Sequence, residues 1–196
     1  MKFIIVGLHA SGKQEVLDAL EQKGVNCGRL FSNIEEADSA IYNSYNYELY
    51  STSEVRNIFE NNAYIFLHAL ESSASINAYK YYEGLSFYEF DSNDVFALSP
   101  NQVVDIPQNI NKSDICYVWL DNTKANRITR FNEERRMYNF NEQDNIETRD
   151  TDVFVKEIYN RPVLYFSNED PQRVATILYA CIQHPSLLDE FIASFS

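Results

Sequence analysis

The stretch KFIIVGLHASGKQEVLDAL, residues 2–20, decides the fold. Phe3–Val6 is a short, continuous apolar run, which predicts a strand that is buried on both faces. A loop with two glycines follows, and then Lys13–Lys23 carries apolar residues at helical spacing. Gly24 stands where a left-handed residue commonly ends a helix. Strand, glycine-bearing loop and helix in this order predict a ligand site at the carboxyl end of the strand.

The loop GLHASGKQ, residues 7–14, predicts a phosphate-binding site. It fits the pattern G-x-x-x-x-G-K-[ST] through Gly7, Gly12 and Lys13, in which main-chain N–H groups wrap an anion beside the positive end of a helix. Lys13 would add a point charge for the phosphates. Gln14 departs from the pattern, because an amide is a poorer Mg²⁺ ligand than the expected hydroxyl. The alternative is a Gly/Lys turn that matches by chance.

The composition indicates a folded, acidic protein. Of the 196 residues, 45% are hydrophobic and 14% aromatic, which argues against disorder. Acidic residues outnumber basic ones 29 to 16, and the net charge is −13. Binding of a nucleic acid polymer needs a cationic surface, so we expect none. Small anionic ligands stay open, because a few Arg and Lys residues can gather in one cleft. An acidic, Asn- and Tyr-rich composition would also suit a phage-encoded protein.

Cysteine spacing and hydropathy predict neither a zinc site, a disulfide framework nor a membrane span. Cys27, Cys116 and Cys181 are odd in number and far apart, with no C-x-x-C or Cys/His cluster. The sequence begins with the strand-like FIIVG and not with a signal-peptide pattern, and no apolar run approaches about 20 residues. We therefore expect a cytoplasmic protein that does not bind a membrane.

The remaining chain predicts an α/β fold with one block of different character. Residues 33–92 are rich in Asn, Ser, Tyr and Glu and give only short signals, which indicates a small inserted lobe. Short apolar strands and helices alternate elsewhere, which predicts a parallel sheet covered by helices on both faces. The predicted strands are Val25–Phe31, Val95–Leu98, Ile115–Leu120 and Val163–Phe166. The predicted helices are Ser53–Asn61, Asn122–Arg136, Asp144–Tyr159, Val174–Ile182 and a short one from Ser186.

An arginine-rich segment is the second candidate for chemistry. Five Arg fall within residues 127–149, and Arg127 and Arg130 share a helix face at i, i+3. Phosphoryl transfer needs cations around the migrating phosphate, often on a segment that closes over it. The alternative is a solvated helix surface on which these arginines pair with nearby acids. Those acids are Glu133, Glu134, Glu142, Asp150 and Asp152.

In its order of motifs the chain resembles the nucleoside monophosphate kinases, the guanylate kinase branch in particular. GLHASGK resembles that family's phosphate loop, and it is the most specific of the similarities. YNYELYSTSEVRNIFENNAYIFLH (45–68), YYEGLS (81–86), RITRF with IETRDTDVF, and VLYFSNED (163–170) resemble later family segments in the same order. The resemblance implies a P-loop kinase-like fold with its core in residues 1–32 and 93–196. It also implies a monophosphate-binding lobe over about 33–92 and an Arg-rich lid over about 127–149.

The resemblance also implies roles for individual residues. ATP, with Mg²⁺, would lie on the loop, and Asn168 would lie near its base. Arg127, Arg130 and Arg149, together with Lys13, would surround the transferred phosphoryl group. The loop residues in contact with ATP would be Gly7, His9, Ala10, Ser11, Gly12, Lys13 and Gln14. The acceptor monophosphate would contact Arg29, Arg56, Tyr82 and Ser86.

Departures from the family leave two functions open. Ser99 stands where the family has a carboxylate, and His68 stands where it has a base-reading Glu; with Gln14 these weaken magnesium support and guanine specificity. His9 is expected to face either solvent or the nucleotide.

One hypothesis is an ATP-dependent kinase of a nucleoside or deoxynucleoside monophosphate. The other is a degenerate kinase that binds a nucleotide or a protein partner without turnover. The sequence leaves the oligomeric state open.

Overall fold

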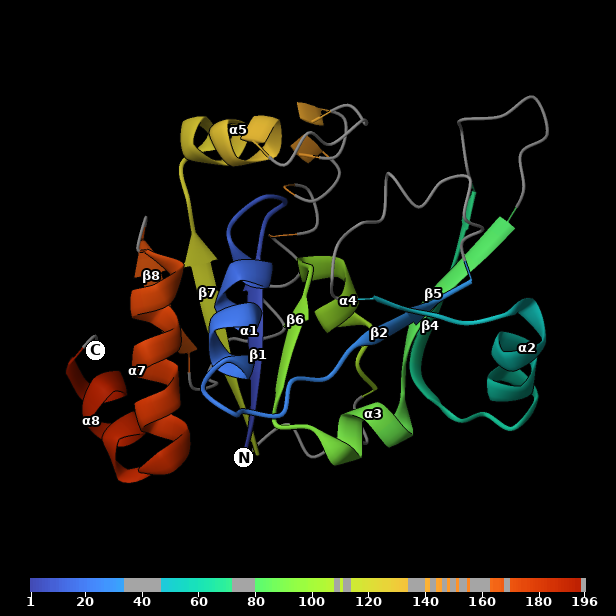
Figure 1. Ribbon diagram of the computed structural model, residues 1–196, viewed down its shortest axis with the longest axis horizontal. Coiled ribbons are helices and arrows are strands. Elements are labelled where there is room, and N and C mark those ends of the chain that lie inside the picture. The colour runs from blue at the N-terminus through green and yellow to red at the C-terminus, as the bar shows by residue number, and fades with distance from the viewer. Residues whose placement is uncertain are drawn as a thin grey trace. The chain divides into compact units, whose positions relative to one another are not determined.

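The structure is a computed structural model of the 196-residue chain, shown in Figure 1. It describes residues 1–33, 47–71, 80–107, 110, 114–133, 140, 141, 144, 145, 148, 151, 155, 163–167 and 170–194. Within those ranges the side chains of 70, 71, 80, 81, 133, 189 and 192–194 are not described. Arg149 and Asn168 therefore lie outside the described residues, as does most of the predicted helix 144–159.

Four parallel strands form the central sheet, in the order β6-β1-β7-β8. Their bounds are Lys2–Gly7 for β1, Val95–Leu98 for β6, Ile115–Asp121 for β7 and Val163–Ser167 for β8. Ile4 on β1 lies opposite Phe96 on one side and Tyr117 on the other. All three side chains are fully buried, as continuous apolar runs predict for a sheet covered on both faces. These four predicted strands are confirmed.

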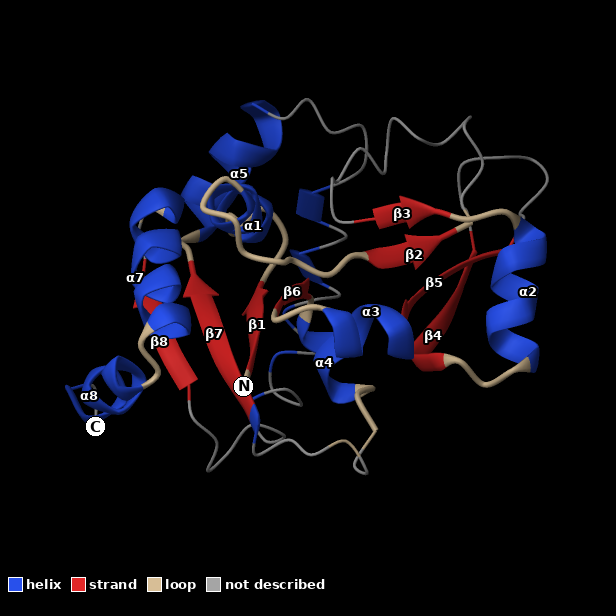
Figure 2. Cartoon of the chain, turned by 60° about the horizontal axis from the view of Figure 1, so that its bottom comes forward, coloured by secondary structure: helices blue, strands red, loops and turns tan. Residues whose placement is uncertain are grey.

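Helices cover both faces of this sheet, which confirms the predicted fold class (Figure 2). Helix α1 (Lys13–Glu21) and helix α7 (Pro171–Gln183) pack on one face, and α8 (Ser186–Ser194) adds Leu188 to the same core. Helix α4 (Pro100–Val104) packs against β1 from the other side and buries Val103. The shared core of the first face includes Phe3, Ile5, Leu17, Leu20, Val118, Leu164, Val174 and Leu178.

Local signals explain where several helices begin and end. Gly24 has a φ of 82°, so the predicted left-handed residue after α1 is confirmed. Helix α7 begins at Pro171, because the Asp170 carboxylate accepts from the Gln172 N–H at 3.3 Å and Pro fits the first helical position. The predicted start at Val174 was therefore wrong. Helix α5 (Lys124–Glu133) confirms the predicted helix 122–136 over residues 124–133, but it begins two residues later than predicted.

Ser99-Pro100-Asn101, which follows β6, begins a helix that was not predicted from the sequence. Ser99 precedes the first residue of α4, and its N–H donates to the Gln102 side chain at 2.9 Å. Pro100 takes the first helical position, where its missing N–H is harmless. The same residues thus end β6 and start α4.

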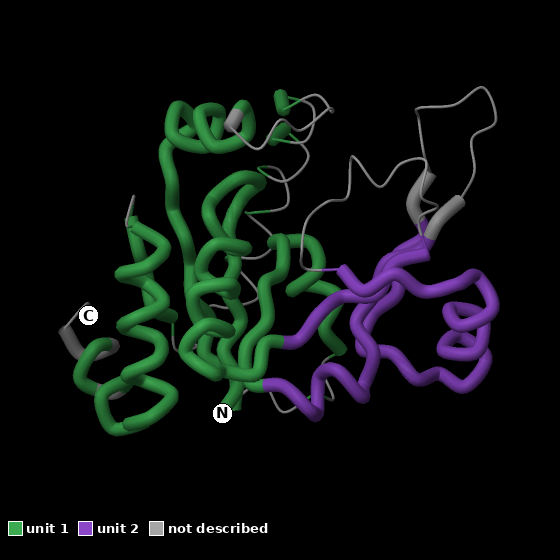
Figure 3. Tube along the Cα trace, viewed as in Figure 1, with its two compact units in different colours: residues 1–27, 94–196 green, residues 28–93 purple. Residues whose placement is uncertain are grey.

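The chain divides into two compact units (Figure 3). The first comprises residues 1–27 and 94–196 and holds the elements above; the second comprises Gly28–Asn93. A second sheet, in the order β3-β2-β5-β4, forms the small unit. Its strands are β2 Leu30–Ser32, β3 Tyr47–Leu49, β4 Tyr64–Glu71 and β5 Lys80–Ser86. Its helices are α2 Thr52–Glu60 and α3 Phe87–Ser92.

One strand prediction near the unit boundary was wrong, and one helix prediction was right. The predicted strand Val25–Phe31 is split: Cys27 makes an isolated bridge to Val95 in the first unit, whereas Leu30 begins β2 of the second sheet. Helix α2 confirms the helix predicted at Ser53–Asn61. Ser51 and Glu54 close its N-terminus as a capping box.

Helix α3 was not predicted. Among the described residues, none of the helices combines the length and the apolar character that crossing a bilayer requires.

Candidate phosphate-binding site

The predicted phosphate loop joins the carboxyl end of β1 to the start of α1. Ser11 N–H donates to Leu8 O at 3.1 Å, which closes a tight turn inside the loop. Ala10 and Gly12 have φ values of 56° and 99°, in the left-handed region. A left-handed conformation at Ala10 is strained, because its Cβ approaches the following carbonyl oxygen. Such strain persists only where the surrounding structure holds it, which is commonly at a functional site.

Close packing requires a glycine at position 7, and the backbone conformation favours one at position 12. A Cβ on Gly7 would lie 2.5 Å from Ser11 Oγ and 2.8 Å from Leu120 O. A Cβ on Gly12 would collide with the guanidinium of Arg130, and the positive φ disfavours any other residue there. The sequence pattern therefore has a steric cause in this chain.

Lys13 and the N-terminus of α1 place positive charge at the loop. Lys13 Nζ donates to Gly7 O at 2.6 Å and to Leu8 O at 3.2 Å, so the ammonium lies over the first residues of the loop. Gly12 is the N-cap of α1, and a glycine has no side-chain oxygen to cap the first N–H groups. An anion can satisfy such N–H groups and interact favourably with the helix dipole.

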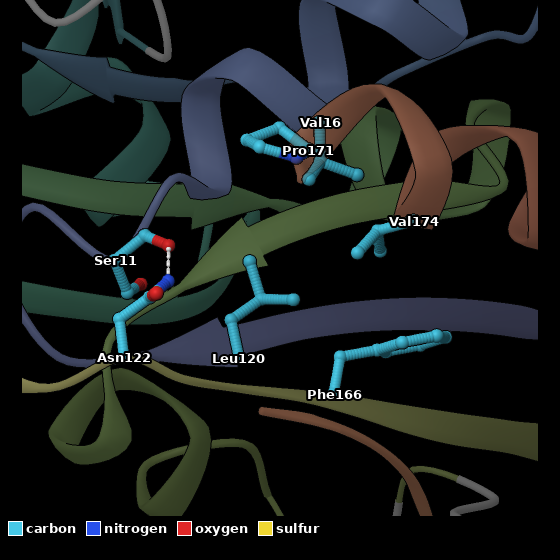
Figure 4. Close-up of a pocket in the computed structure, with 7 residues that line it drawn as sticks. All are labelled: Ser11, Val16, Leu120, Asn122, Phe166, Pro171 and Val174. Carbon is cyan, nitrogen blue, oxygen red and sulfur yellow. Dashed lines mark hydrogen bonds between the residues drawn. The ribbon is translucent and has the colours of Figure 1, made fainter. Parts of the chain in front are cut away.

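A small space under the loop is a packing gap. Val16, Leu120 and Val174 are among the residues that line it, and it is too small to admit a water molecule. Figure 4 shows Ser11 and Asn122 at one side, where Asn122 Nδ2 donates to Ser11 O at 2.6 Å. Ser11 Oγ is buried without a hydrogen-bond partner among the described residues. The hydrogen bond from Asn122 to Ser11 O connects the loop to the end of β7.

Arg130 lies beside Gly12. Its Nη1 donates to the Glu15 carboxylate at 3.2 Å, and the side chain of Arg130 is 22% exposed. Glu15 is itself exposed, on the first turn of α1. The pair thus bridges α5 and the helix that follows the loop.

Arg127 also contacts the loop, but it is buried and only 4% exposed. It donates through Nη1 to His9 O and through Nε to Asn122 O, each at 3.3 Å. Nη1 also pairs with Asp144 Oδ1 at 2.6 Å, and Lys124 Nζ pairs with Asp144 Oδ2 at 2.9 Å. Burial acts to raise the pKa of Asp144, but hydrogen bonds and charges from Lys124 and Arg127 outweigh it and hold the pKa below its usual value.

The His9 side chain is buried against two aromatic rings, so the reading in which it faces solvent is corrected. Its ring centroid lies 5.6 Å from that of Phe131 in an edge-to-face arrangement and 6.2 Å from that of Phe140. The rings of Phe131 and Phe140 also meet edge to face at 5.4 Å. The sequence gave no signal that aromatic residues of the arginine-rich segment would pack on the loop.

The structure thus brings together one group of predicted site residues. Around the loop lie Gly7, His9, Ala10, Ser11, Gly12, Lys13, Gln14, Arg127 and Arg130. Sequence reasoning missed Asp144 and Glu15, the two carboxylates that pair with the arginines. The alternative of a solvated helix surface is wrong for Arg127, which is 4% exposed. The side chains of the five acids named for it lie outside the described residues.

The predicted acceptor residues all lie in the small unit. The main-chain N–H of Arg29 donates to the Glu89 carboxylate at 3.2 Å, and the Ser86 hydroxyl accepts from the main-chain N–H of Glu89 at 3.1 Å as the N-cap of α3. Tyr82 is in β5, and its N–H donates to Asn33 Oδ1 at 2.6 Å. Arg56 is exposed on α2. Arg29 and Ser86 therefore meet at Glu89, whereas Arg56 belongs to the outer surface of that unit.

Gln14 and Ser99, the two positions at which magnesium support is in question, offer neutral oxygens only. Gln14 Nε2 donates to Asp18 at 2.6 Å, and Gln14 Oε1 is buried without a hydrogen-bond partner among the described residues. That oxygen could contact a cation, but it is neutral, and proteins hold Mg²⁺ chiefly through carboxylates, phosphates and water. The Ser99 hydroxyl donates to Asn101 Oδ1 at 2.5 Å. The described residues contain no cluster of three acidic, His or Cys residues suited to a metal.

The fold is similar to a solved structure whose sequence is very different. The crystal structure of guanylate kinase from Anaplasma phagocytophilum matches with a TM-score of 0.51 over 93% of this chain and 84% of that chain. This chain has a guanylate-kinase-like fold. At 7% sequence identity the similarity shows a guanylate-kinase-like fold alone, which confirms the sequence resemblance at that level. No protein-family model matches the sequence, and the search of curated proteins found no match.

Proposed function

We propose that this protein is a nucleoside or deoxynucleoside monophosphate kinase that transfers the γ-phosphate of ATP to an NMP or dNMP. The main support is the strained loop of residues 7–13, which carries Lys13 and has Arg130 beside Gly12. The guanylate-kinase-like fold supports a nucleotide as the ligand of this loop. The acceptor base and sugar are left open by this proposal.

The roles follow from charge and position. Main-chain N–H groups of the loop and of the first turn of α1 would bind the phosphate chain of ATP, and Lys13 would neutralise part of its charge. Arg130 would add a second cation at the same helix end. Bound ATP would supply the transferable phosphoryl group, with Mg²⁺ carried by its phosphates and by water. No protein nucleophile is needed, because positioning and charge neutralisation supply the catalysis.

The acceptor residues and two undescribed residues complete the proposal. Arg29, Tyr82 and Ser86 would contact the acceptor, and Arg29 and Ser86 already share the partner Glu89. Arg56 would have to reach the acceptor from an exposed helix face. Arg149 and Asn168 keep the roles that the family resemblance implies, near the transferred phosphate and the ATP base.

A coupled assay with ATP and each common monophosphate and deoxynucleoside monophosphate tests this function. We expect turnover with at least one acceptor and its loss in Lys13→Ala, because the loop would lack its central cation. Lys23→Ala, on the same unit but beyond the end of α1, is the matched control and is expected to retain activity. The absence of Lys13-dependent turnover with every acceptor would rule out the proposed kinase function.

The second candidate is a degenerate kinase that binds nucleotide without turnover. The observation that favours it is that Ser99 and Gln14, which stand where magnesium support is expected, offer only neutral oxygens. Titration with ATP in the presence and absence of Mg²⁺ separates the two. Binding that is equally strong without the metal, together with no turnover, supports the degenerate form. Binding that requires Mg²⁺ supports the kinase.

A further inference from the structure

Two arginines one turn apart on α5 have very different surroundings. The Arg127 side chain is 4% exposed and points into the protein. The Arg130 side chain is 22% exposed and lies beside the N-terminus of α1. The family resemblance gave both the same role, as cations for the transferred phosphate. Their contacts favour a division of labour between them.

The position of Arg127 depends on Asp144. A buried guanidinium is tolerated only when its charge and N–H groups are paired, and Asp144 supplies the charge at 2.6 Å. Arg127 also donates to two main-chain carbonyls, His9 O in the loop and Asn122 O after β7. Arg127 therefore joins the loop to the end of the neighbouring strand, and Asp144 holds it there.

Further contacts hold Asp144 itself in place. Lys124, three residues before Arg127, pairs with the second carboxylate oxygen at 2.9 Å. Four residues before Asp144 along the chain, Phe140 lies under both cations, with ring-centroid distances of 5.5 Å to the Arg127 guanidinium carbon and 5.9 Å to Lys124 Nζ. Phe140 and Asp144 thus fix α5 against the loop.

Arg130 has a weaker hold. Its pair with Glu15 is longer, at 3.2 Å, and both side chains reach solvent. Pairs of this kind contribute little stability because water screens them. An incoming phosphate, with more charge and more acceptor oxygens than one carboxylate, can replace Glu15.

We propose that Asp144 is a positioning residue of the nucleotide site, which holds the loop in shape through Arg127. Arg130 is then the α5 arginine that exchanges its Glu15 partner for a phosphate of the bound nucleotide. The exchange at Arg130 rests on the proposed nucleotide-binding function, but the support of the loop by Asp144 does not.

A matched pair of carboxylate-to-amide variants tests both parts. Each variant, Asp144→Asn or Glu15→Gln, removes the acidic partner of one α5 arginine. The rate of amide hydrogen exchange at residues 8–12 without nucleotide measures how often the loop opens. Calorimetric titration with ATP measures the binding affinity.

The two substitutions are expected to have opposite effects on ATP affinity. In Asp144→Asn, loop exchange should rise by roughly tenfold, and ATP should bind roughly tenfold more weakly because the loop is misplaced. In Glu15→Gln, loop exchange should match the wild type, and ATP should bind about two- to fivefold more tightly, the range of an exposed ion pair. Asp144→Glu, which keeps the charge, should stay closer to the wild type than Asp144→Asn in both measurements.

A second variant covers the case in which Asp144→Asn does not fold. Arg127→Met/Asp144→Leu removes both buried charges, which is often neutral for stability, and it also removes the hydrogen bond to His9 O. Its loop exchange should be fast even where its melting temperature is that of the wild type.

Unchanged loop exchange in a folded variant lacking the pair would overturn the role of Asp144. ATP affinities that shift in the same direction in Asp144→Asn and Glu15→Gln would overturn the division of labour. A wild-type protein that does not bind ATP would remove the proposed function and the exchange at Arg130. The loop measurement would still decide the role of Asp144.

Discussion

Each unit of this protein contains a buried carboxylate, and the two are held in different ways. Asp144 in the first unit is 4% exposed and Glu83 in the small unit is 6% exposed. Asp144 is paired with two permanent cations, Arg127 and Lys124. Glu83 accepts from the Tyr47 hydroxyl at 2.7 Å and lies 3.5 Å from Nδ1 of His68.

The difference shows how each unit uses a buried charge. The Asp144 pairs connect a helix to the loop at the edge of an apolar parallel sheet. The Glu83 contacts connect strands β3, β4 and β5 of the small sheet, since Tyr47, His68 and Glu83 lie on one each. A carboxylate with fixed cations braces a site at any ordinary pH, whereas a contact with histidine depends on the protonation of the imidazole.

The largest effect is expected from Arg127→Ala, which leaves Asp144 buried beside a single cation. Removing one partner of a buried pair costs about 3–5 kcal/mol of unfolding free energy. Urea unfolding of the wild type and the variant measures it. Arg130→Ala on the same helix is the control and should lose less than about 1 kcal/mol, because its pair with Glu15 is partly exposed. Equal losses in the two variants would contradict the distinction between the two arginines.

A smaller effect is expected in the small unit from Tyr47→Phe, which removes the hydroxyl that donates to buried Glu83. The free energy of unfolding should fall by about 1–3 kcal/mol, the cost of removing the donor to a buried acceptor. Tyr50→Phe is the matched control, because the Tyr50 hydroxyl donates to Glu48 at an exposed position. The control should change stability by about 0.5 kcal/mol or less. An equally large fall in unfolding free energy in Tyr50→Phe would contradict the claim that burial makes the Tyr47–Glu83 hydrogen bond the more important of the two.

The smallest effect concerns pH and tests the pairing of Asp144. The pKa of Asp144 is lowered in the folded protein from its usual 3.8, so its pairing stabilises the fold fully above that pH. This contribution is lost as pH falls through the folded pKa. The stability difference between wild type and Asp144→Asn should therefore shrink below pH 3.8, as followed by thermal melts. A difference that stays constant through this range would contradict the paired carboxylate.

Local patterns were enough to predict the sheet of the first unit and its loop. Apolar runs marked β1, β6, β7 and β8 because strands buried on both faces exclude polar residues. Gly7 and Gly12 could be placed because the motif reserves glycine for such positions: a Cβ on Gly7 would lie 2.8 Å from Leu120 O, and Gly12 has a φ of 99°. The fold class was accessible for the same reason, since alternating strands and helices leave few topologies.

The partners of the arginines could not be predicted, for a physical reason. Asp144 reaches Arg127 across 17 residues of chain, and Glu15 reaches Arg130 across 115. No local periodicity records which of the 29 acidic residues will meet a given arginine after folding. The split of the predicted strand Val25–Phe31 has a similar origin, because the passage from one unit to the other leaves no signal in hydropathy.

The central claim is that the loop of residues 7–13 binds the phosphate chain of a nucleotide, and amide NMR during titration with ATP tests it most directly. The account predicts that the largest shifts occur at residues 8–14 and that Lys13→Ala abolishes them. ATP-induced shifts that lie elsewhere, or that persist unchanged in Lys13→Ala, would contradict it.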